Sequence, residues 1–197
     1  MDFILASKSP RRRELLENIG LPFIAIETNA EDETTVYPSP EDMVLELSLK
    51  KAKACLMKAP EESIIIGADT IVVIGGKILG KPKDYNEGFF MLKSLSGKTH
   101  TVYTGMTLIY KHKNGEKTYS SISTAEVTIK ALNDREIKAY LDTGEYEDKA
   151  GSYGIQGKGA VFIDKICGDY FAVVGFSLSS FFDAFKALGF NISDFWK

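Results

Sequence analysis

Residues 64–82, IIIGADTIVVIGGKILGKP, constrain the fold of this 197-residue chain more than any other stretch. The apolar runs at 64–66 and 71–74 are β-branched, which predicts strands buried on both faces. Asp69 interrupts them, and we expect it to stand at the end of a buried strand. An ionised carboxylate in such surroundings destabilises the fold unless a cation meets it. The pattern therefore indicates that Asp69 is either paired for structure or kept for chemistry.

The composition excludes several classes of protein. Hydrophobic residues make up 44% and charged residues 26% of the chain, which argues against disorder, and the length suits one α/β domain over residues 1–197. With 24 basic and 27 acidic residues there is no charge excess to hold a nucleic-acid backbone, so no polymer partner is expected.

The start of the chain and its cysteines predict a cytoplasmic protein. The first residues, MDFILAS, include no basic segment, and no apolar run approaches the length of a membrane span. Cys55 and Cys167 are too few for a disulfide framework and fit a reducing compartment. We therefore expect neither a signal peptide nor contact with a membrane.

Helix and strand signals alternate along the chain. Besides the two runs around Asp69, β-rich patterns predict strands at residues 3–5, 22–27, 77–79, 102–110 and 118–130. Capping residues predict helices from Ser9 to Gly20, Ser39 to Met57, Asp84 to Leu95, Asn133 to Gly144 and Ser177 to Gly189. The pairs Gly75-Gly76 and Asn114-Gly115 predict hairpin turns.

An arginine cluster lies at the start of the first predicted helix. Three of the four arginines are consecutive, Arg11 to Arg13, in a chain that otherwise uses lysine. Guanidinium groups bind phosphate with two parallel hydrogen bonds, and the first turn of a helix adds unpaired N–H groups. With Ser7 and Ser9 this favours a phosphate-binding corner, and a solvated helix start is the alternative.

Several common motifs are excluded. Residues 75–82 satisfy G-x-x-x-x-G-K, but Pro82 stands where a hydroxyl should reach magnesium. Residues 154–161, GIQGKGAV, do not form a dinucleotide fingerprint, and two histidines are too few for a zinc cluster or a Ser-His-Asp triad. What remains is a set of cations and carboxylates, which suits phosphoryl or nucleotidyl transfer to water.

Seven blocks in collinear order carry a resemblance to a known family. They are LASKSPRRRELL (5–16), KKAKA (50–54), GADTIV (67–72), GKPKD (80–84), LSGKTHTVYTG (95–105), DKAGSYGIQGKGA (148–160) and GDYFAVVGFSL (168–178). Together they resemble the Maf family of nucleoside triphosphate pyrophosphatases over nearly the whole chain. The resemblance implies a single Maf-like domain over 1–197, an α/β fold with a curved mixed β-sheet and flanking helices. It also implies two lobes around a cleft, as in inosine triphosphate pyrophosphatases.

The resemblance also implies a reaction and its residues. Water attacks the α-phosphorus of a nucleoside triphosphate, releasing a monophosphate and pyrophosphate, with a divalent metal cation, Mg²⁺ or Mn²⁺. Asp69 is then the general base, or the residue that holds the metal and the water. The positions that match the family's phosphate contacts are Ser7, Arg11, Arg12, Lys51 and Lys81.

An acidic stretch completes the metal site in this resemblance. The family has two adjacent acids where this chain has three, Glu31, Asp32 and Glu33. We assign the metal to Glu31, Asp32 and Asp69, and the choice among the three consecutive acids is open by one position.

Three further positions resemble the dTTP/UTP branch of the family. This chain has Arg11, Thr70 and Gln156 where the 7-methyl-GTP branch has Trp, Gln and Glu. A Gln amide offers both a donor and an acceptor to an uncharged uracil-type edge. The expected substrate is therefore dTTP or UTP, or a modified pyrimidine nucleotide. The alternatives are a 7-methyl-GTP or other purine-selective pyrophosphatase, and a nucleotide-binding regulator of septum formation with little turnover. A homodimer is compatible with the sequence.

Overall fold

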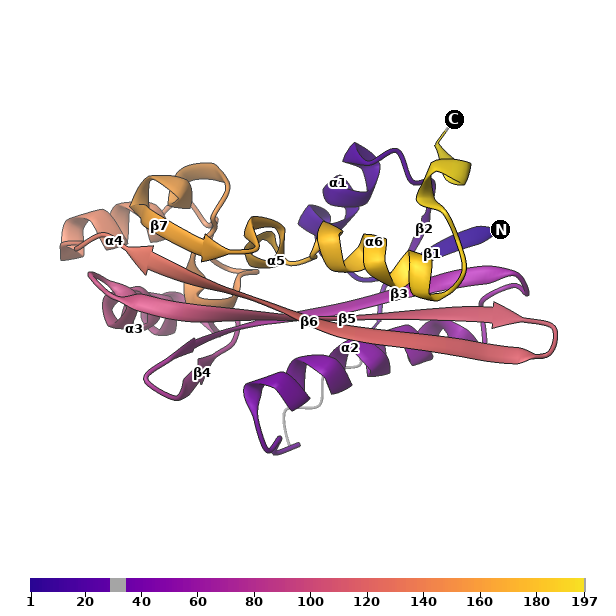
Figure 1. Cartoon of the computed structure of the whole chain (residues 1–197). Coiled ribbons are helices and arrows are strands. Elements are labelled where there is room, and N and C mark those ends of the chain that lie inside the picture. Colours follow the sequence, from indigo (N-terminus) through magenta and orange to yellow (C-terminus); the bar gives the residue numbers. More distant parts are fainter. Residues whose placement is uncertain (29–34, 197) are drawn as a thin grey trace. The chain divides into compact units, whose positions relative to one another are not determined.

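A computed structural model describes residues 1–28 and 35–196 of the chain (Figure 1). Its seven strands form one mixed sheet in the order β2-β1-β3-β5-β6-β7, with β4 paired to β3. The strands are β1 (Asp2–Ala6), β2 (Ile24–Ile26), β3 (Ser63–Ile74), β4 (Lys77–Leu79), β5 (Thr99–His112), β6 (Gly115–Ile129) and β7 (Ile163–Gly168). The prediction of a mixed α/β fold with flanking helices is confirmed.

The helices begin close to the predicted caps, except that no helix was predicted for residues 170–174. They are α1 (Pro10–Asn18), α2 (Pro40–Leu56), α3 (Tyr85–Leu95), α4 (Asp134–Leu141), α5 (Tyr170–Val174) and α6 (Leu178–Ala187). The Asn133 side chain accepts the N–H of Glu136 in a capping box, and Ser177 accepts the N–H of Ser180. These predicted starts are confirmed. Each helix in the described part of the chain is too short or too polar to traverse a lipid bilayer.

The chain divides into two compact units. The first comprises residues 1–69, 104–123 and 175–197, and the second comprises residues 70–103 and 124–174. The predicted single domain over 1–197 and the predicted cleft between two lobes stay predictions.

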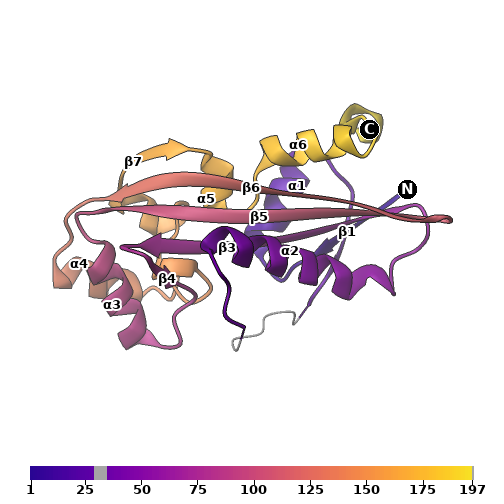
Figure 2. The same cartoon turned by 60° about the horizontal axis from the view of Figure 1, so that its bottom comes forward.

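Side chains that point alternately to the two faces of β1 and β3 build the core of the first unit. β1 runs parallel to β3, with Ile4 opposite Ile65. These two residues pack with Ala52 of α2, whereas Phe3 stacks on Phe185 of α6. Figures 1 and 2 show α2 on one face of these strands and α6 on the other. Successive side chains of a strand point to opposite faces. Each run of apolar residues therefore supplies side chains to the core on both faces of the sheet.

The strand around Asp69 is continuous, and the prediction that this residue ends a strand was wrong. β3 runs for 12 residues and carries Asp69 in its interior. β1 pairs with β3 only as far as Gly67, and β4 pairs with it from Val72 onward. The change of partner, not the end of the strand, occurs at the acid.

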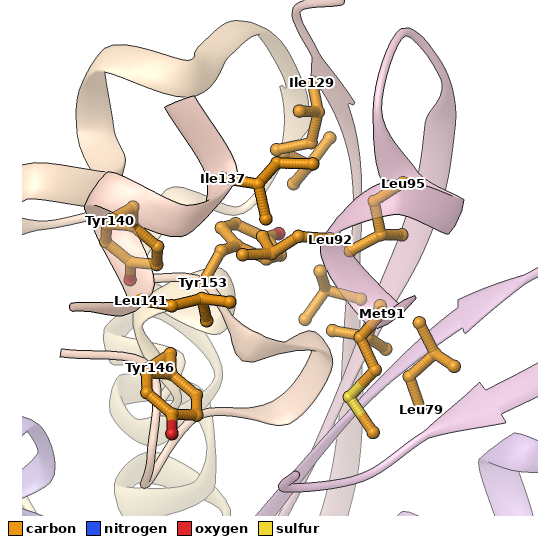
Figure 3. Packing of buried hydrophobic residues seen from close by; sticks show 13 residues of the cluster. Leu79, Met91, Leu92, Leu95, Ile129, Ile137, Tyr140, Leu141, Tyr146 and Tyr153 are labelled. Carbon is orange, nitrogen blue, oxygen red and sulfur yellow. The ribbon is translucent and has the colours of Figure 1, made fainter. Parts of the chain in front are cut away.

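The second unit has its own apolar core. Residues of α3 and α4, including Leu92 and Ile137, are buried there together with Tyr140 and Tyr153. Figure 3 shows the ring of Tyr153 in the middle of this cluster. Aromatic rings of this size account for much of the apolar area that a small core removes from water.

Candidate active site

Asp69 lies on the α2 face of the sheet because of strand alternation. Ile65 and Asp69 are four residues apart along β3, with Gly67 midway between them, so the two side chains share one face. Ile65 packs with Ala52 and Cys55 of α2, which identifies that face. Asp69 therefore points toward the same helix.

A glycine lets α2 approach β3 closely. A Cβ atom at Gly67 would lie 2.2 Å from the carbonyl oxygen of Ser48 and 2.8 Å from the backbone nitrogen of Ala52. On the neighbouring strand β5, a Cβ atom at Gly105 would lie 2.2 Å from the carbonyl oxygen of Val44. Neither contact is compatible with a side chain, so both glycines are required for the seat of α2.

The seat of α2 places Lys51 against Asp69. Lys51 Nζ lies 2.5 Å from Asp69 Oδ1, and the side chains are 8% and 10% exposed. Two charges removed from water are tolerated when they are paired, whereas one left alone is strongly destabilising. The cation that the sequence requires for Asp69 is therefore Lys51.

A second pair joins Ser7 to Arg12. The buried Arg12 guanidinium donates from Nε to the carbonyl oxygen of Gly175 at 2.8 Å and from Nη1 to Ser7 Oγ at 3.3 Å. Ser7 Oγ also accepts the backbone N–H of Ser9 at 3.1 Å. Ser9 occupies the N-cap position, but its side chain makes no capping hydrogen bond, contrary to the prediction. The hydroxyl that orders the turn belongs to Ser7, two residues earlier.

The strand register brings the two pairs to neighbouring positions. Ala6, the last residue of β1, is opposite Gly67 in the parallel ladder. Ser7 directly follows β1, and Asp69 lies two residues beyond Gly67 on β3. Arg11 is half-buried in the first turn of α1. The first unit contains five of the predicted residues, Ser7, Arg11, Arg12, Lys51 and Asp69.

The other predicted residues fall into two groups. Thr70, Lys81 and Gln156 belong to the second unit, where Lys81 is exposed after β4 and Gln156 is half-buried before the 3₁₀ helix Gly157–Phe162. Their approach to Asp69 stays a prediction. Glu31, Asp32 and Glu33, predicted for the metal, lie outside the described residues.

Comparison with known proteins identifies the family. The family model described as Maf-like protein matches residues 2–188. The chain belongs to the Maf family.

Relatives of this Maf chain share about half of its sequence. A protein of Thermoanaerobacter sp. (strain X514), named dTTP/UTP pyrophosphatase, is 53% identical over 186 residues, which is 94% of this chain and 96% of the relative. A protein of Bacillus cytotoxicus with the same name is 51% identical over 177 residues, 90% of each chain.

Among solved structures, a nucleoside-triphosphatase / dITP/XTP pyrophosphatase from Mycobacterium abscessus is similar to this chain at 14% identity, with a TM-score of 0.35. The match covers 67% of this chain and 76% of that one. Similarity at this level does not establish a shared fold, so the predicted likeness to inosine triphosphate pyrophosphatases rests on the sequence resemblance.

The carboxylate of Asp69 is a ligand of the kind that a hard divalent cation binds. Mg²⁺ takes oxygen ligands and is usually held by one or two carboxylates with waters and substrate phosphates. Asp69 offers such an oxygen donor, although Lys51 already bonds Oδ1. Within residues 1–28 and 35–196 there is no group of three or more metal-ligating side chains. Asp69 therefore offers one oxygen ligand of the kind that such a cation prefers.

Sequence reasoning missed the residues that position Lys51 against Asp69. Gly67 and Gly105 seat α2, yet the sequence shows them only as small residues inside strands. In the second unit it also missed Glu145, which binds the backbone of residues 158 and 159 although no motif connects them. A glycine inside a strand is a general signal for close backbone approach and could have indicated the first two.

Proposed function

We propose that this chain hydrolyses UTP and dTTP at the α-phosphorus to the nucleoside monophosphate and pyrophosphate. The observation that carries the proposal is the buried carboxylate of Asp69, held by Lys51 in a chain of the Maf family. Relatives named dTTP/UTP pyrophosphatase, about half identical over nearly the whole chain, support the choice of substrate.

Asp69 is the general base that activates the attacking water in this reaction. Its carboxylate orients a water molecule and accepts its proton while the water oxygen bonds to the α-phosphorus. The bond from the α-phosphorus to the α,β-bridging oxygen breaks, and pyrophosphate leaves with that oxygen. General base catalysis of this kind contributes about 10²–10⁴-fold to the rate.

Cationic and hydroxyl groups bind the phosphates of the substrate. We assign these contacts to Ser7, Arg11, Arg12, Lys51 and Lys81, because phosphoryl transfer depends on positioning and on neutralising charge. Arg12 also fixes Ser7 through its hydrogen bond, so its contribution is partly one of orientation.

A divalent cation, Mg²⁺ or Mn²⁺, accompanies the substrate in this proposal. Asp69 would hold it, with Glu31 and Asp32 as further ligands. When bound, the cation supplies positive charge to the phosphate oxygens and lowers the energy of the charged transition state. The base is recognised by Thr70 and Gln156. The cytoplasmic location and a homodimer belong to the same proposal.

A triphosphate panel tests the reaction. Purified protein with Mg²⁺ or Mn²⁺ is given UTP, dTTP, CTP, GTP or 7-methyl-GTP in ¹⁸O-labelled water, and the products are identified by mass. We expect UMP and dTMP that carry the label, together with unlabelled pyrophosphate, because attack at the α-phosphorus adds water oxygen to the monophosphate. Release of orthophosphate would overturn the reaction, and preference for 7-methyl-GTP would favour the purine alternative.

A matched pair of variants tests the role of Asp69. We expect D69N to lose about 10²–10⁴-fold in kcat. D164N, at an exposed position of β7, is the control and should keep the wild-type rate. Full turnover by D69N would contradict the proposal. Calorimetric binding of UTP without any turnover by the wild type would favour the regulatory alternative instead.

A further inference from the structure

The segment that carries Gln156 folds around one carboxylate. Glu145 Oε2 accepts the backbone N–H of Lys158 at 2.8 Å, and Oε1 accepts that of Gly159 at 3.1 Å. Oε1 also accepts the hydroxyl of Tyr140 at 3.2 Å. Three donors therefore converge on a half-buried anion.

The same network reaches the other side of Gln156. The backbone N–H of Gly154 donates to the hydroxyl oxygen of Tyr140 at 3.1 Å. Gln156 thus lies between Gly154, bound through Tyr140, and Lys158, bound directly to Glu145. A segment fixed on both sides of one residue leaves that residue few backbone conformations.

The glycines of the segment allow it to wrap the carboxylate. Gly157 has a φ of +70°, and a Cβ atom there would lie 2.7 Å from Glu145 Oε2. A Cβ atom at Gly154 would lie 3.1 Å from Oε1, and one at Gly159 would lie 3.1 Å from the Tyr140 hydroxyl. Contacts within the chain thus explain these glycines: Glu145 and Tyr140 lie close to them, and a Cβ atom at Gly159 would also lie 2.5 Å from the carbonyl oxygen of Gly154.

Glu145 is itself held in place. Lys149 Nζ donates to its carbonyl oxygen, and Tyr140 projects from α4 into the core of the second unit (Figure 3). Burial would raise the pKa of the Glu145 carboxyl, but hydrogen bonds from Lys158, Gly159 and Tyr140 hold that pKa below its usual value. The network thus favours the charged form, which makes stronger hydrogen bonds to N–H donors.

We infer that Glu145, with Tyr140, is the positioning residue for pyrimidine recognition: its carboxylate fixes the segment 154–159 so that the Gln156 amide meets the base in one orientation. The inference rests on the proposed function, in which Gln156 reads the base. A uracil-type edge and a cytosine edge present opposite donor and acceptor patterns, so discrimination between them requires a fixed amide. Glu145 is not assigned any contact with substrate.

The test combines kinetics with hydrogen exchange. In E145Q the carboxylate is replaced by a neutral amide, and E147Q, an exposed neighbour, is the matched control. We expect E145Q to raise KM for UTP about tenfold and to lower the UTP to CTP ratio of kcat/KM about tenfold, with a smaller change in kcat. The amides of Lys158 and Gly159 should exchange at least about tenfold faster in substrate-free E145Q than in the wild type.

The outcomes separate the inference from the proposed function. Unchanged protection of the two amides in E145Q overturns the role of Glu145 in fixing the segment. Faster exchange with an unchanged UTP to CTP ratio overturns its role in base recognition. A wild type that turns over no triphosphate overturns the proposed function, while the amide measurement still decides the first point. Should E145Q fail to fold, Y140F removes the hydroxyl between Gly154 and Glu145 and is expected to show the same changes at smaller size.

Discussion

Lys51 Nζ of α2 lies 2.5 Å from Asp69 Oδ1 of β3, with both side chains almost fully buried. The two residues are 18 positions apart, and they meet because α2 rests directly on the backbone of β3 at Gly67. The proposed catalytic carboxylate therefore depends on helix packing as well as on charge.

Replacing Lys51 by Met tests the ion pair. K51M keeps most of the apolar stem but leaves Asp69 as a buried charge without this partner. We expect the free energy of unfolding to fall by about 3–5 kcal/mol, together with loss of turnover. Urea denaturation and kcat measurements check both effects.

Two further variants complete this test. K53M, at an exposed position of the same helix, should unfold like the wild type. The double variant K51M/D69N should be more stable than K51M alone, because the carboxylate is then also gone. A K51M protein as stable as K53M would contradict a strong buried pair.

Gly67→Ala tests the seat of α2. The added methyl group would overlap the Ser48 carbonyl, and overpacking of this kind destabilises by about 1–3 kcal/mol. Because the displaced turn of α2 carries Lys51, we expect kcat to fall as well. G105A is the matched control, since its overlap with the Val44 carbonyl is equally close but lies about one turn before Ser48 on α2 and so farther from Lys51. Equal losses of kcat in both variants would argue against a specific effect on Lys51.

Arg12→Lys tests the second pair. A lysine cannot bond Gly175 and Ser7 with the fixed geometry of a guanidinium. We expect the free energy of unfolding to fall by about 1–3 kcal/mol, measured in urea, because the buried hydrogen bond from Arg12 Nε to the Gly175 carbonyl is lost. R135K, on the exposed face of α4, should change it by no more than about 0.5 kcal/mol. If R12K matches R135K, the hydrogen bonds of Arg12 contribute little to stability.

The burial of His100 should make the protein less stable in mild acid. It is 2% exposed, and burial lowers its pKa from 6.5 to about 4. The unfolded chain takes up a proton first, so the free energy of unfolding falls as the pH drops from 6.5 toward 4, by at most about 1.4 kcal/mol per pH unit.

Urea denaturation between pH 7 and 5 measures this change in the free energy of unfolding. Most carboxylates titrate below about pH 5, so they contribute little in this range. In H100Q the free energy of unfolding should depend much less on pH above pH 5, whereas H112Q should keep the pH dependence of the wild type. An H100Q protein with the wild-type slope would assign the acid sensitivity to other groups.

Removal of divalent cations should abolish turnover and leave the fold intact. Asp69 already has Lys51 as its partner, so the fold does not need a metal to neutralise this carboxylate. With EDTA we expect no UTP hydrolysis, recovery on adding Mg²⁺ or Mn²⁺, and a Tm unchanged within about 2 °C. A large drop in Tm would indicate a structural metal instead.

The sequence predicted most elements because their signals are local. Asn133 and Ser177 mark helix starts by capping chemistry that needs only the next three residues. The error at Asp69 has the same origin, because a polar residue within an apolar run looks like a strand end. Only the folded sheet shows that β3 continues through this residue.

The sequence by itself determined that Asp69 is a buried acid in need of a cation, since burial and charge follow from residue types. Tertiary structure alone decided that Lys51 is this cation and that Glu145 binds the segment around Gln156. These contacts join residues 13 to 18 positions apart, and their geometry depends on how closely helix, strand and loop backbones approach. Such distances are set by packing across the whole fold, for which no local pattern exists.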